Sequence, residues 1–349
     1  MKIKRKRLTD FAVSIFVSMG TSEKHATEVA THLVEANLKG HDSHGVGLIP
    51  YYVNSWDKGG LKVNADATLE KDKGPIMLVN GNLGFGQVVG RQATDMGIER
   101  AKEIGLACVG SRNNHHLGRI GAFGEHCAKA GLISIHFVNV VGHPPVVSPW
   151  GGREARMSTN PFCCAVPTSE GPIVLDMATS AIAGGKVSVA RRKGLNVPDG
   201  CLFDADGVPT NNPDDFFTGG TLGPFGQHKG YGLGLICELL GGALAGEWTI
   251  QDVDKQKNGV TVNGMLMFIV DPDLFGGQDG FEREVKGMSE WLYASQPANG
   301  FDKVRLPGEP ESESMATRLT DGISIDDKSW SDIVGVAKRV GGNEKEIPT

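Results

Sequence analysis

The stretch His41-Asp42-Ser43-His44-Gly45 directly follows an amphipathic helix expected over residues 23–38, and the rest of the chain is organised around it. Gly40 before it and Gly45 within it end the helix and let a ligand approach the backbone closely. Two imidazoles, a carboxylate and a hydroxyl stand within four residues. Histidine gains and loses a proton near neutral pH, so the stretch suits acid–base chemistry. A polar helix C-cap explains the same residues equally well, and the remaining sequence has to decide.

The bulk composition is that of a soluble globular protein large enough for two structural units. The chain has 349 residues, of which 40% are hydrophobic and 22% charged, with a net charge of −6. Acidic and basic residues are mixed along the chain, so we expect no nucleic-acid partner. The basic start is not followed by the apolar region of a signal peptide, and no apolar run of about 18 residues could span a membrane. The six cysteines form no C-x-x-C pair, which favours free thiols in the cytoplasm.

Hydrophobic periodicity predicts helices and strands that do not alternate strictly. Helices are expected over 8–19, 23–38, 51–59, 87–104, 118–130, 230–245 and 281–295. Strands are expected over 76–79, 106–109, 132–138, 164–167, 173–176 and 265–270, with 164–167 and 173–176 forming a hairpin. The helix at 230–245 is apolar almost all round, so we expect it to be buried. The pattern predicts an α+β fold with a mixed sheet.

Several common motifs are missing from the sequence. No Gly-x-Gly-x-x-Gly follows a predicted strand, so a dinucleotide would not be bound through the Rossmann fingerprint. A P-loop, His-Glu-x-x-His and Gly-x-Ser-x-Gly are also missing. The histidines lack the clustered spacing of metal ligands, and we expect no metal site.

Three further polar stretches lie beside predicted helices and strands. His115-His116-Leu117-Gly118-Arg119 leads into a helix whose free N–H groups suit phosphate, unless one histidine is merely a cap. Asp176 ends an apolar strand, where it can orient a histidine or cap a helix, and Lys186 follows further on, where it can also be a surface residue. His228-Lys229 precede the apolar helix, where charged groups need a bound anion or a carboxylate partner, unless the loop is exposed.

In this order, the polar stretches resemble the family of malate/L-lactate dehydrogenases that lack a Rossmann fold. That family also contains ureidoglycolate, sulfolactate, diketogulonate and piperideine-carboxylate enzymes. The resemblance covers nearly the whole chain, and each motif alone is weak but the ordered set is specific. The motifs are Asp42-Ser43-His44-Gly45, His116-x-Gly118, Thr159-Asn160-Pro161, Asp176-Met177-Ala178-Thr179-Ser180 with Gly185-Lys186, Asp206-Gly207-x-Pro209-Thr210, His228-Lys229-Gly230-Tyr231 and Leu306-Pro307-Gly308-Glu309.

The resemblance implies a mixed α/β, non-Rossmann fold with a largely antiparallel NAD(P)-binding sheet wrapped by helices. The helical N-terminal segment 1–73 is expected to be joined by the C-terminal segment 300–349. Residues 74–299 are expected to form the cofactor-binding and catalytic domain. A cytoplasmic homodimer with its sites near the subunit interface is also implied.

The implied reaction is a reversible hydride transfer between NAD or NADP and the C2 carbonyl or hydroxyl of a 2-oxo or 2-hydroxy carboxylate. By motif, His116 exchanges a proton with the substrate oxygen, while His44, with its neighbour Ser43, lies against the nicotinamide or the substrate. Asp176 is expected to orient His44. In some members of the family the His44–Asp176 pair itself has the acid–base role, so the sequence leaves open which imidazole moves the proton.

The resemblance also assigns binding residues. Cofactor contacts are expected from His44, Gly118, Arg119, Ile120, Ile173, Val174, Leu175, Asp176, Met177, Ala178, Lys186, His228, Pro307, Gly308 and Glu309. Substrate contacts are expected from Leu48, Tyr52, Thr159, Asn160 and Lys229.

Leu48 departs from the family pattern, because many members carry there an arginine that grips a substrate carboxylate. Its loss disfavours a second carboxylate, as in malate, and favours an apolar side chain, as in aryl-pyruvates. Two alternatives stay open, namely a non-catalytic ligand-binding protein on the same scaffold and a reductase of a cyclic imine carboxylate.

Overall fold

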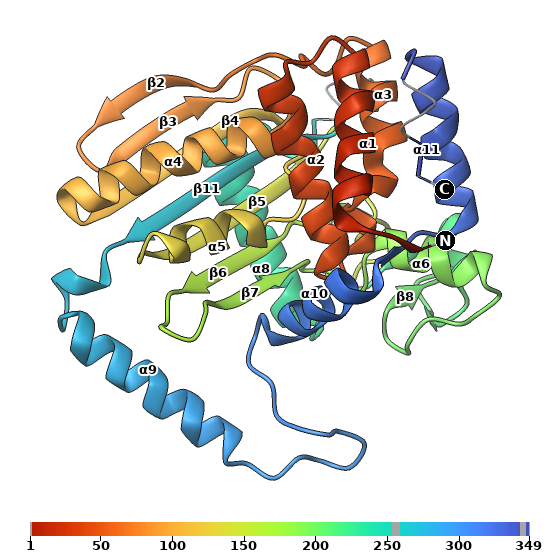
Figure 1. Cartoon of the computed structure of the whole chain (residues 1–349). Coiled ribbons are helices and arrows are strands. Elements are labelled where there is room, and N and C mark those ends of the chain that lie inside the picture. Colours follow the sequence, from red (N-terminus) through yellow and green to blue (C-terminus); the bar gives the residue numbers. More distant parts are fainter. Residues whose placement is uncertain (1, 253–258, 343–346, 349) are drawn as a thin grey trace.

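The computed structural model describes residues 2–252, 259–342 and 347–348. Within these ranges, no helix has the length and apolar character needed to cross a membrane. Elements from both ends of the chain lie together at one side of the molecule, next to a large central sheet (Figure 1).

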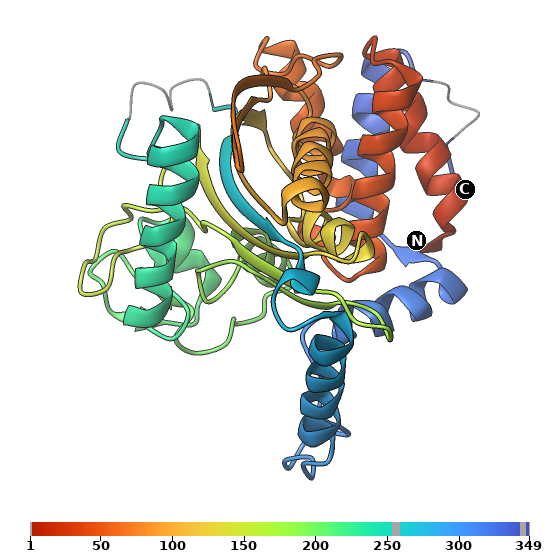
Figure 2. The same cartoon turned by 90° about the vertical axis from the view of Figure 1, so that its left-hand side faces the viewer.

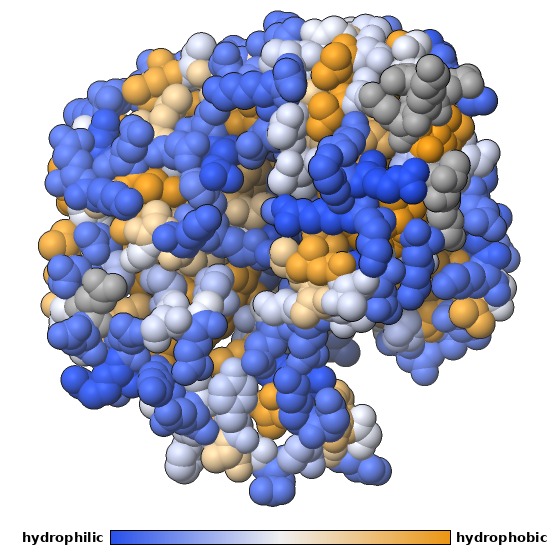
Figure 3. Space-filling model, viewed as in Figure 1, coloured by the Kyte–Doolittle hydropathy of each residue, from blue (hydrophilic) through white to orange (hydrophobic). Residues whose placement is uncertain are grey.

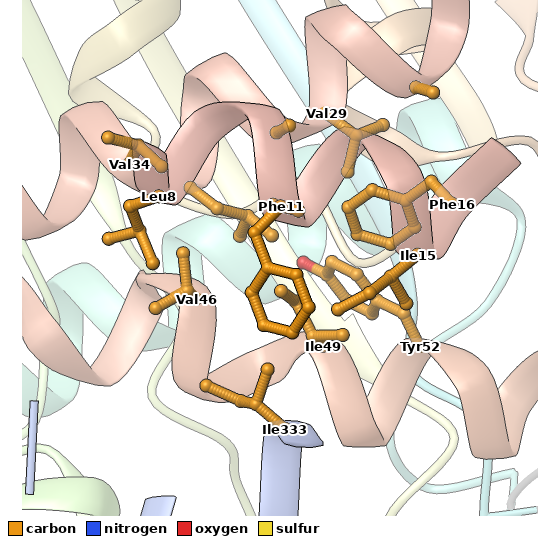
Figure 4. Packing of buried hydrophobic residues seen from close by; sticks show 14 of the residues in the cluster. Leu8, Phe11, Ile15, Phe16, Val29, Val34, Val46, Ile49, Tyr52 and Ile333 are labelled. Carbon is orange, nitrogen blue, oxygen red and sulfur yellow. The ribbon is translucent and has the colours of Figure 1, made fainter. Parts of the chain in front are cut away.

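The N-terminal helices form a core of their own with the end of the chain. Helices α1 (Arg5–Ser18), α2 (Glu23–Leu38) and α3 (Ile49–Asp57) pack with α11 (Asp327–Arg339), and strand β1 (Lys2–Ile3) pairs with β12 (Ile323–Ser324). Figure 4 shows how Phe11, Ile15, Ile49 and Ile333 meet in this core beside the ring of Tyr52. Each such side chain contributes about 1.5–3 kcal/mol when fully buried, and Val46 in this core fixes the segment between α2 and α3 to the helices.

Within the described part of the chain, the central sheet has seven strands in the order β2-β3-β4-β11-β5-β6-β7. All neighbouring pairs are antiparallel except β3 and β4, so the expected largely antiparallel, non-Rossmann sheet is confirmed. The predicted hairpin is also confirmed, as β6 and β7. The strands are β2 (Thr68–Lys73), β3 (Ile76–Asn80), β4 (Leu106–His115), β5 (Ile133–Val141), β6 (Phe162–Val166), β7 (Ile173–Met177) and β11 (Val262–Val270).

Helices cover both faces of this sheet (Figure 2). On one face lie α4 (Gly86–Ile104) and α5 (Gly121–Lys129), next to the N-terminal helices. On the other face lie α8 (His228–Cys237) and the π-helix η3 (Glu238–Gly246) that continues it.

Two smaller parts complete the fold. A small lobe with its own core contains α6 (Gly184–Arg192), β8 (Leu202–Phe203), β9 (Pro209–Thr210), α7 (Pro213–Phe217) and β10 (Thr221–Leu222). Helix α9 (Gln278–Tyr293) extends away from the body as an arm, and the chain then returns to α10 (Glu309–Asp321) beside α2 (Figures 1 and 2).

Two expectations are wrong. The apolar helix at 230–245 is not buried, since Leu235, Ile236, Leu239 and Leu244 are 38–65% exposed. Its small residues face the sheet, where a Cβ on Gly241 would lie 2.7 Å from the carbonyl oxygen of Phe137, and its large residues therefore point outward.

The boundary expected at residue 73 is also misplaced, because β2 belongs to the sheet. Every residue of this edge strand is exposed, so the strand lacks the alternating apolar pattern that identifies strands in a sequence. We keep the division into a helical unit and a sheet domain as a proposal, with the first boundary moved before residue 68.

Candidate active site

The opening stretch forms two short 3-10 turns, η1 (Asp42–His44) and η2 (Val46–Leu48), between α2 and α3. Asp42 accepts hydrogen bonds from Asn37 Nδ2 at 2.7 Å and from Arg318 on α10 at 2.6 Å. These contacts fix the stretch to two helices. Ser43 and His44 consequently face a cavity, so the stretch is more than a helix cap.

Three cavities meet around these residues. The inner cavity, about 160 Å³, is lined by His116, His143, Asn263 and the apolar Val138 and Val140, among others. The central cavity, about 530 Å³, shares His44, Gly118, Ile120, Thr159 and Pro161 with the inner one. The outer cavity, about 690 Å³, shares Glu311 with the central one. Together they reach from the two histidines to the loop at 306–309.

His116 directly follows β4, and its ring is held by hydrogen bonds from the helical core. Its Nδ1 lies 2.9 Å from the hydroxyl of Tyr52, which in turn accepts a hydrogen bond from Gln87 Nε2 at 2.7 Å. The rings of His116 and His44 stack with centroids 5.8 Å apart and an interplanar angle of 18°. This arrangement leaves Nε2 of His116 for a ligand in the inner cavity.

Both stacked rings are neutral at pH 7. Burial, followed by the neighbouring imidazoles of His44 and His115, holds the pKa of His116 well below its ordinary value. Burial also lowers the pKa of His44 to about 4, with His41, Arg119 and Lys186 adding to the effect. The site therefore holds two imidazoles that can accept a proton.

Asp176 does not pair with His44 among the described residues. Its Oδ2 accepts a hydrogen bond from the backbone N–H of Gly121 at 2.7 Å and lies 3.9 Å from Arg119 Nη1. His44 Nδ1 instead lies 3.0 Å from the hydroxyl of Ser43. The expected orientation of His44 by Asp176 is thus not seen, because the carboxylate is already used at the start of α5. Burial raises its pKa, and it still lines the central cavity.

Gly118 brings bare backbone to the central cavity. It has a φ of +78°, and a Cβ there would lie 2.6 Å from Nε2 of His32. Arg119 donates its backbone N–H to the same Nε2 at 3.0 Å, so the helix α5 begins later than predicted, at Gly121. No side chain larger than hydrogen fits at position 118.

Most of the other predicted site residues line the central or the outer cavity. The central cavity is lined by Ser43, His44, Gly118, Arg119, Ile120, Thr159, Asp176, Met177, Ala178 and Lys186. The outer cavity is lined by Ile173, Val174, Pro307, Gly308 and Glu309.

Three predicted substrate contacts line none of the three cavities. Tyr52 is fully buried in the helical core and reaches the site only through His116. Leu48 packs against the same core. The buried amide of Asn160 points away from the cavities and donates to Glu238 Oε2 at 2.7 Å. Sequence shows residue type but not the direction of a side chain, which tertiary packing sets.

Three more predicted residues are displaced from the cavities. His228 and Lys229 are exposed at the start of α8, and the His228 ring lies 6.4 Å from that of Trp150. The charged groups therefore do not lie at a dry helix end. Leu175 is 38% exposed on the edge strand β7, because its neighbours Val174 and Asp176 take the opposite face.

The sequence did not single out Gln87 or the inner-cavity residues His143, Thr261 and Asn263. A signal was present for Asn263, a polar residue within the otherwise apolar strand β11. Gln87 lies in a helix and carried no signal, because its partner Tyr52 is 35 residues away in the sequence.

The fold places two stacked histidines at the inner end of a series of joined cavities. The family model described as malate/L-lactate dehydrogenase matches residues 3–334, and the chain belongs to this family.

Curated relatives agree in length and class. Hydroxycarboxylate dehydrogenase B of Escherichia coli (strain K12) is 44% identical over 344 residues, covering 97% of this chain and 94% of that protein. L-lactate dehydrogenase of Cupriavidus necator is 39% identical, covering 97% of each. The solved sulfolactate dehydrogenase of Methanocaldococcus jannaschii superposes with a TM-score of 0.90 at 32% identity, covering 99% of both chains. The chain is therefore an enzyme that oxidises or reduces 2-hydroxy and 2-oxo acids.

Proposed function

We propose that the enzyme uses NAD or NADP to interconvert a 2-oxo and a 2-hydroxy carboxylate, with His116 exchanging the proton at the C2 oxygen. The observation that carries this proposal is the junction of the inner and central cavities between His116 and His44. A substrate in the inner cavity has its reacting carbon between the histidine and the central cavity.

The central and outer cavities fit an extended dinucleotide. Bare backbone faces them at Gly118 and at Gly308, where a Cβ would lie 3.2 Å from the backbone N of Val174. Lys186 lines the central cavity without an ion-pair partner among the described residues, and its ammonium group suits a pyrophosphate. When bound, the nicotinamide gives or takes the hydride at C2. We propose that His44 lies beside it and that residues 307–309 hold the adenosine end.

Tyr52 lets His116 change its protonation state. Its hydroxyl oxygen accepts a hydrogen bond from Nδ1–H of His116, which leaves the lone pair of Nε2 free in the neutral ring and keeps the same hydrogen bond when Nε2 is protonated. Nε2 of His116 takes the hydroxyl proton when a hydroxy acid is oxidised and returns it when an oxo acid is reduced. The hydrogen bond from Gln87 fixes Tyr52, so the imidazole keeps its position through both steps.

We propose a substrate with a neutral side chain. Among the residues that the structure describes, the walls of the inner cavity include Ile120, Val138, Val140 and Pro161 and no lysine or arginine. Its volume of about 160 Å³ is close to that of cavities that hold a benzene ring. An aryl or small alkyl group therefore fits better than the second carboxylate of malate.

We further infer a homodimer. Leu235, Ile236, Leu239 and Leu244 form an exposed apolar face on α8 and η3, and Trp291 on the arm α9 is 75% exposed. The face shown in Figure 3, on the side of α4 and the N-terminal helices, is by contrast mostly hydrophilic. Large contiguous apolar patches mark contact surfaces, and a second copy would cover this one.

The dimer is tested by Leu239→Glu, which places a charge in the centre of the exposed apolar face. Light scattering is expected to give the mass of two chains for the wild type and of one chain for the variant. Val17→Glu, at an exposed position on α1, is the control and is expected to stay dimeric. A wild type with the mass of one chain would contradict the inference.

We also place the enzyme in the cytoplasm. All six cysteine side chains are free, and several are buried in apolar surroundings, which suits a reducing compartment.

The proposed function is tested by following the absorbance of NADH and NADPH with pyruvate, oxaloacetate, phenylpyruvate and hydroxyphenylpyruvate. We expect turnover with at least one cofactor, and kcat/KM about 10–200-fold higher for a neutral side chain than for oxaloacetate. Cofactor binding without turnover of any acid would instead support the non-catalytic alternative. Turnover of a cyclic imine carboxylate alone would support the imine reductase.

A further inference from the structure

A buried carboxylate outside the cavities connects two walls of the site. Glu238 begins the π-helix η3 and is only 5% exposed. Its oxygens accept hydrogen bonds from the backbone N–H of Ile250 at 2.7 Å, from Asn160 Nδ2 at 2.7 Å and from Asn139 Nδ2 at 3.4 Å. No cation among the described residues forms an ion pair with it. A carboxylate is buried in this way only when several donors satisfy it.

Two branches of hydrogen bonds start at Glu238, and the first branch leads through Asn160 to the wall shared by the inner and central cavities. Asn160 is fully buried and has a φ of +29°, a conformation that an asparagine keeps only when its surroundings hold it. Its Nδ2 donates to Glu238 and also to the carbonyl oxygen of Gly234 at 3.1 Å. Its neighbours Thr159 and Pro161 line both cavities, so the hydrogen bond that Asn160 donates to Glu238 sets where this wall lies.

The second branch leads to His116. The carbonyl oxygen of Asn139 accepts a hydrogen bond from Asn263 Nδ2 at 2.8 Å. Asn263 Oδ1 in turn accepts the backbone N–H of Leu117 at 2.8 Å. Leu117 directly follows His116, so this branch ends at the backbone of the proton-exchanging residue.

The π-helix brings the carboxylate close enough to make both branches. A Cβ at Gly242 would lie 2.5 Å from Asn139 Nδ2, and one at Gly241 would lie 2.7 Å from the carbonyl oxygen of Phe137. Glycine at these two positions lets η3 touch the sheet with its backbone. π-Helices are rare and are found mostly at functional sites.

We propose that Glu238 is a positioning residue that holds the 159–161 wall at a fixed distance from His116. The proposal rests on the proposed function, in which the substrate reacts between these two walls. A displacement of about 1 Å in such a site can lower the rate about 100-fold. Glu238 therefore acts on the reaction through Asn160 and Asn263, without touching the substrate.

The test uses three variants, namely Glu238→Gln, Asn160→Gly and the double variant that combines these two changes. A fourth variant, Glu247→Gln, is the control. Glutamine keeps the size of Glu238 but replaces one acceptor oxygen with an N–H₂ group that faces a donor. Glycine at 160 removes the hydrogen bond to Glu238 and adopts a positive φ without strain. Glu247 is the matched control, since its exposed carboxylate follows η3 and pairs with Arg112.

We expect kcat/KM for the 2-oxo acid to fall about 10–100-fold in each single variant, with NADH affinity close to that of the wild type. The double variant is expected to lose no more kcat/KM than the less active of the two single variants, because both changes break the same hydrogen bond between Asn160 and Glu238. Hydrogen exchange across residues 157–163 is expected to speed up in the same variants. Glu247→Gln is expected to match the wild type in all three measurements.

Wild-type kcat/KM in either single variant, or losses that multiply in the double variant, would overturn the proposal. If Glu238→Gln does not fold, Asn160→Gly alone decides by the same criterion. If the wild type consumes no NADH or NADPH with any acid, the proposed function fails. Unchanged hydrogen exchange across 157–163 would in that case still overturn the connection between Glu238 and the wall.

Discussion

The two directions of the proposed reaction require opposite protonation states of the His116 imidazole. Burial and the neighbouring histidines lower its pKa, so the free ring is neutral above pH 6.5. In the proposed reaction, oxidation of a hydroxy acid needs a neutral His116 ring as base, whereas reduction of an oxo acid needs the charged ring as acid. The two directions of the reaction therefore start from different fractions of competent enzyme.

We predict opposite pH dependences for the two directions. Above pH 6.5, kcat/KM for oxidation is expected to be flat, because the base is already neutral. In the same range kcat/KM for reduction is expected to fall about tenfold per pH unit, because the charged fraction falls by that factor. Initial rates in both directions test this, and an oxidation profile that loses activity as pH falls toward 6.5 would contradict it.

At single residues, the sequence indicated which residues gather at the cavities better than it indicated the direction of each side chain. His44, Ser43 and His116 were identified from their spacing and family motifs, and the structure places them around the joined cavities. Asn160 was expected to contact the substrate, but its side chain donates a hydrogen bond to the buried Glu238. Tyr52 was also expected to contact the substrate, but it contacts His116 and lines none of the cavities. Such side-chain directions depend on partners far away in the sequence, which no local pattern contains.

Among the elements, the turn between β4 and α5 depends on one glycine. Gly118 and Gly131 both have positive φ, but only Gly118 has an atom close to where a Cβ would be. We predict that Gly131→Ala lowers the free energy of unfolding by about 1–2 kcal/mol, the cost of a left-handed alanine, and keeps full activity.

Gly118→Ala is expected to lose more stability than Gly131→Ala and to lose NADH binding, because the methyl group displaces His32 or the cavity wall. Urea unfolding and fluorescence titration with NADH measure the two effects. Equal losses of stability in the two variants would show that position 118 has room for a side chain.

Elements with strong periodicity were predictable. Helix α2, helix α9 and the β6–β7 hairpin lie within a few residues of the ranges expected from the sequence. Strand β2 was missed because all of its residues are exposed, and the helix at 230–245 was placed inside because composition alone does not show which of its faces meets the sheet. Apolar residues that are exposed on the surface of one chain are explained only by the partner that covers them.

For the whole molecule, buried histidines control stability in acid. Burial lowers the pKa of His32 and His115 to about 3, lowers that of His136 and His44 to about 4, and lowers that of His116 as well. Below pH 6.5 the unfolded chain binds protons that the folded chain does not bind. Stability is therefore complete above pH 6.5 and is lost as pH falls toward these lowered values.

We predict that the free energy of unfolding falls between pH 7 and pH 5, by about 1.4 kcal/mol per pH unit for each buried histidine once its unfolded form is charged. Urea unfolding at fixed protein concentration measures this slope. His136→Gln, which removes one such group that lines none of the three cavities, is expected to reduce the slope by about 1.4 kcal/mol per pH unit. An unchanged stability at pH 5 would contradict the assignment of neutral buried rings.

The central claim is that His116 exchanges the proton in a nicotinamide-dependent reaction, and His116→Gln tests it most directly. We predict that kcat/KM for the best 2-oxo acid falls about 10²–10⁴-fold, whereas the affinity for NADH stays close to that of the wild type. His126→Gln, on the outer side of α5 and paired with Asp95, is the control and is expected to keep full activity. Full turnover by His116→Gln would contradict the account.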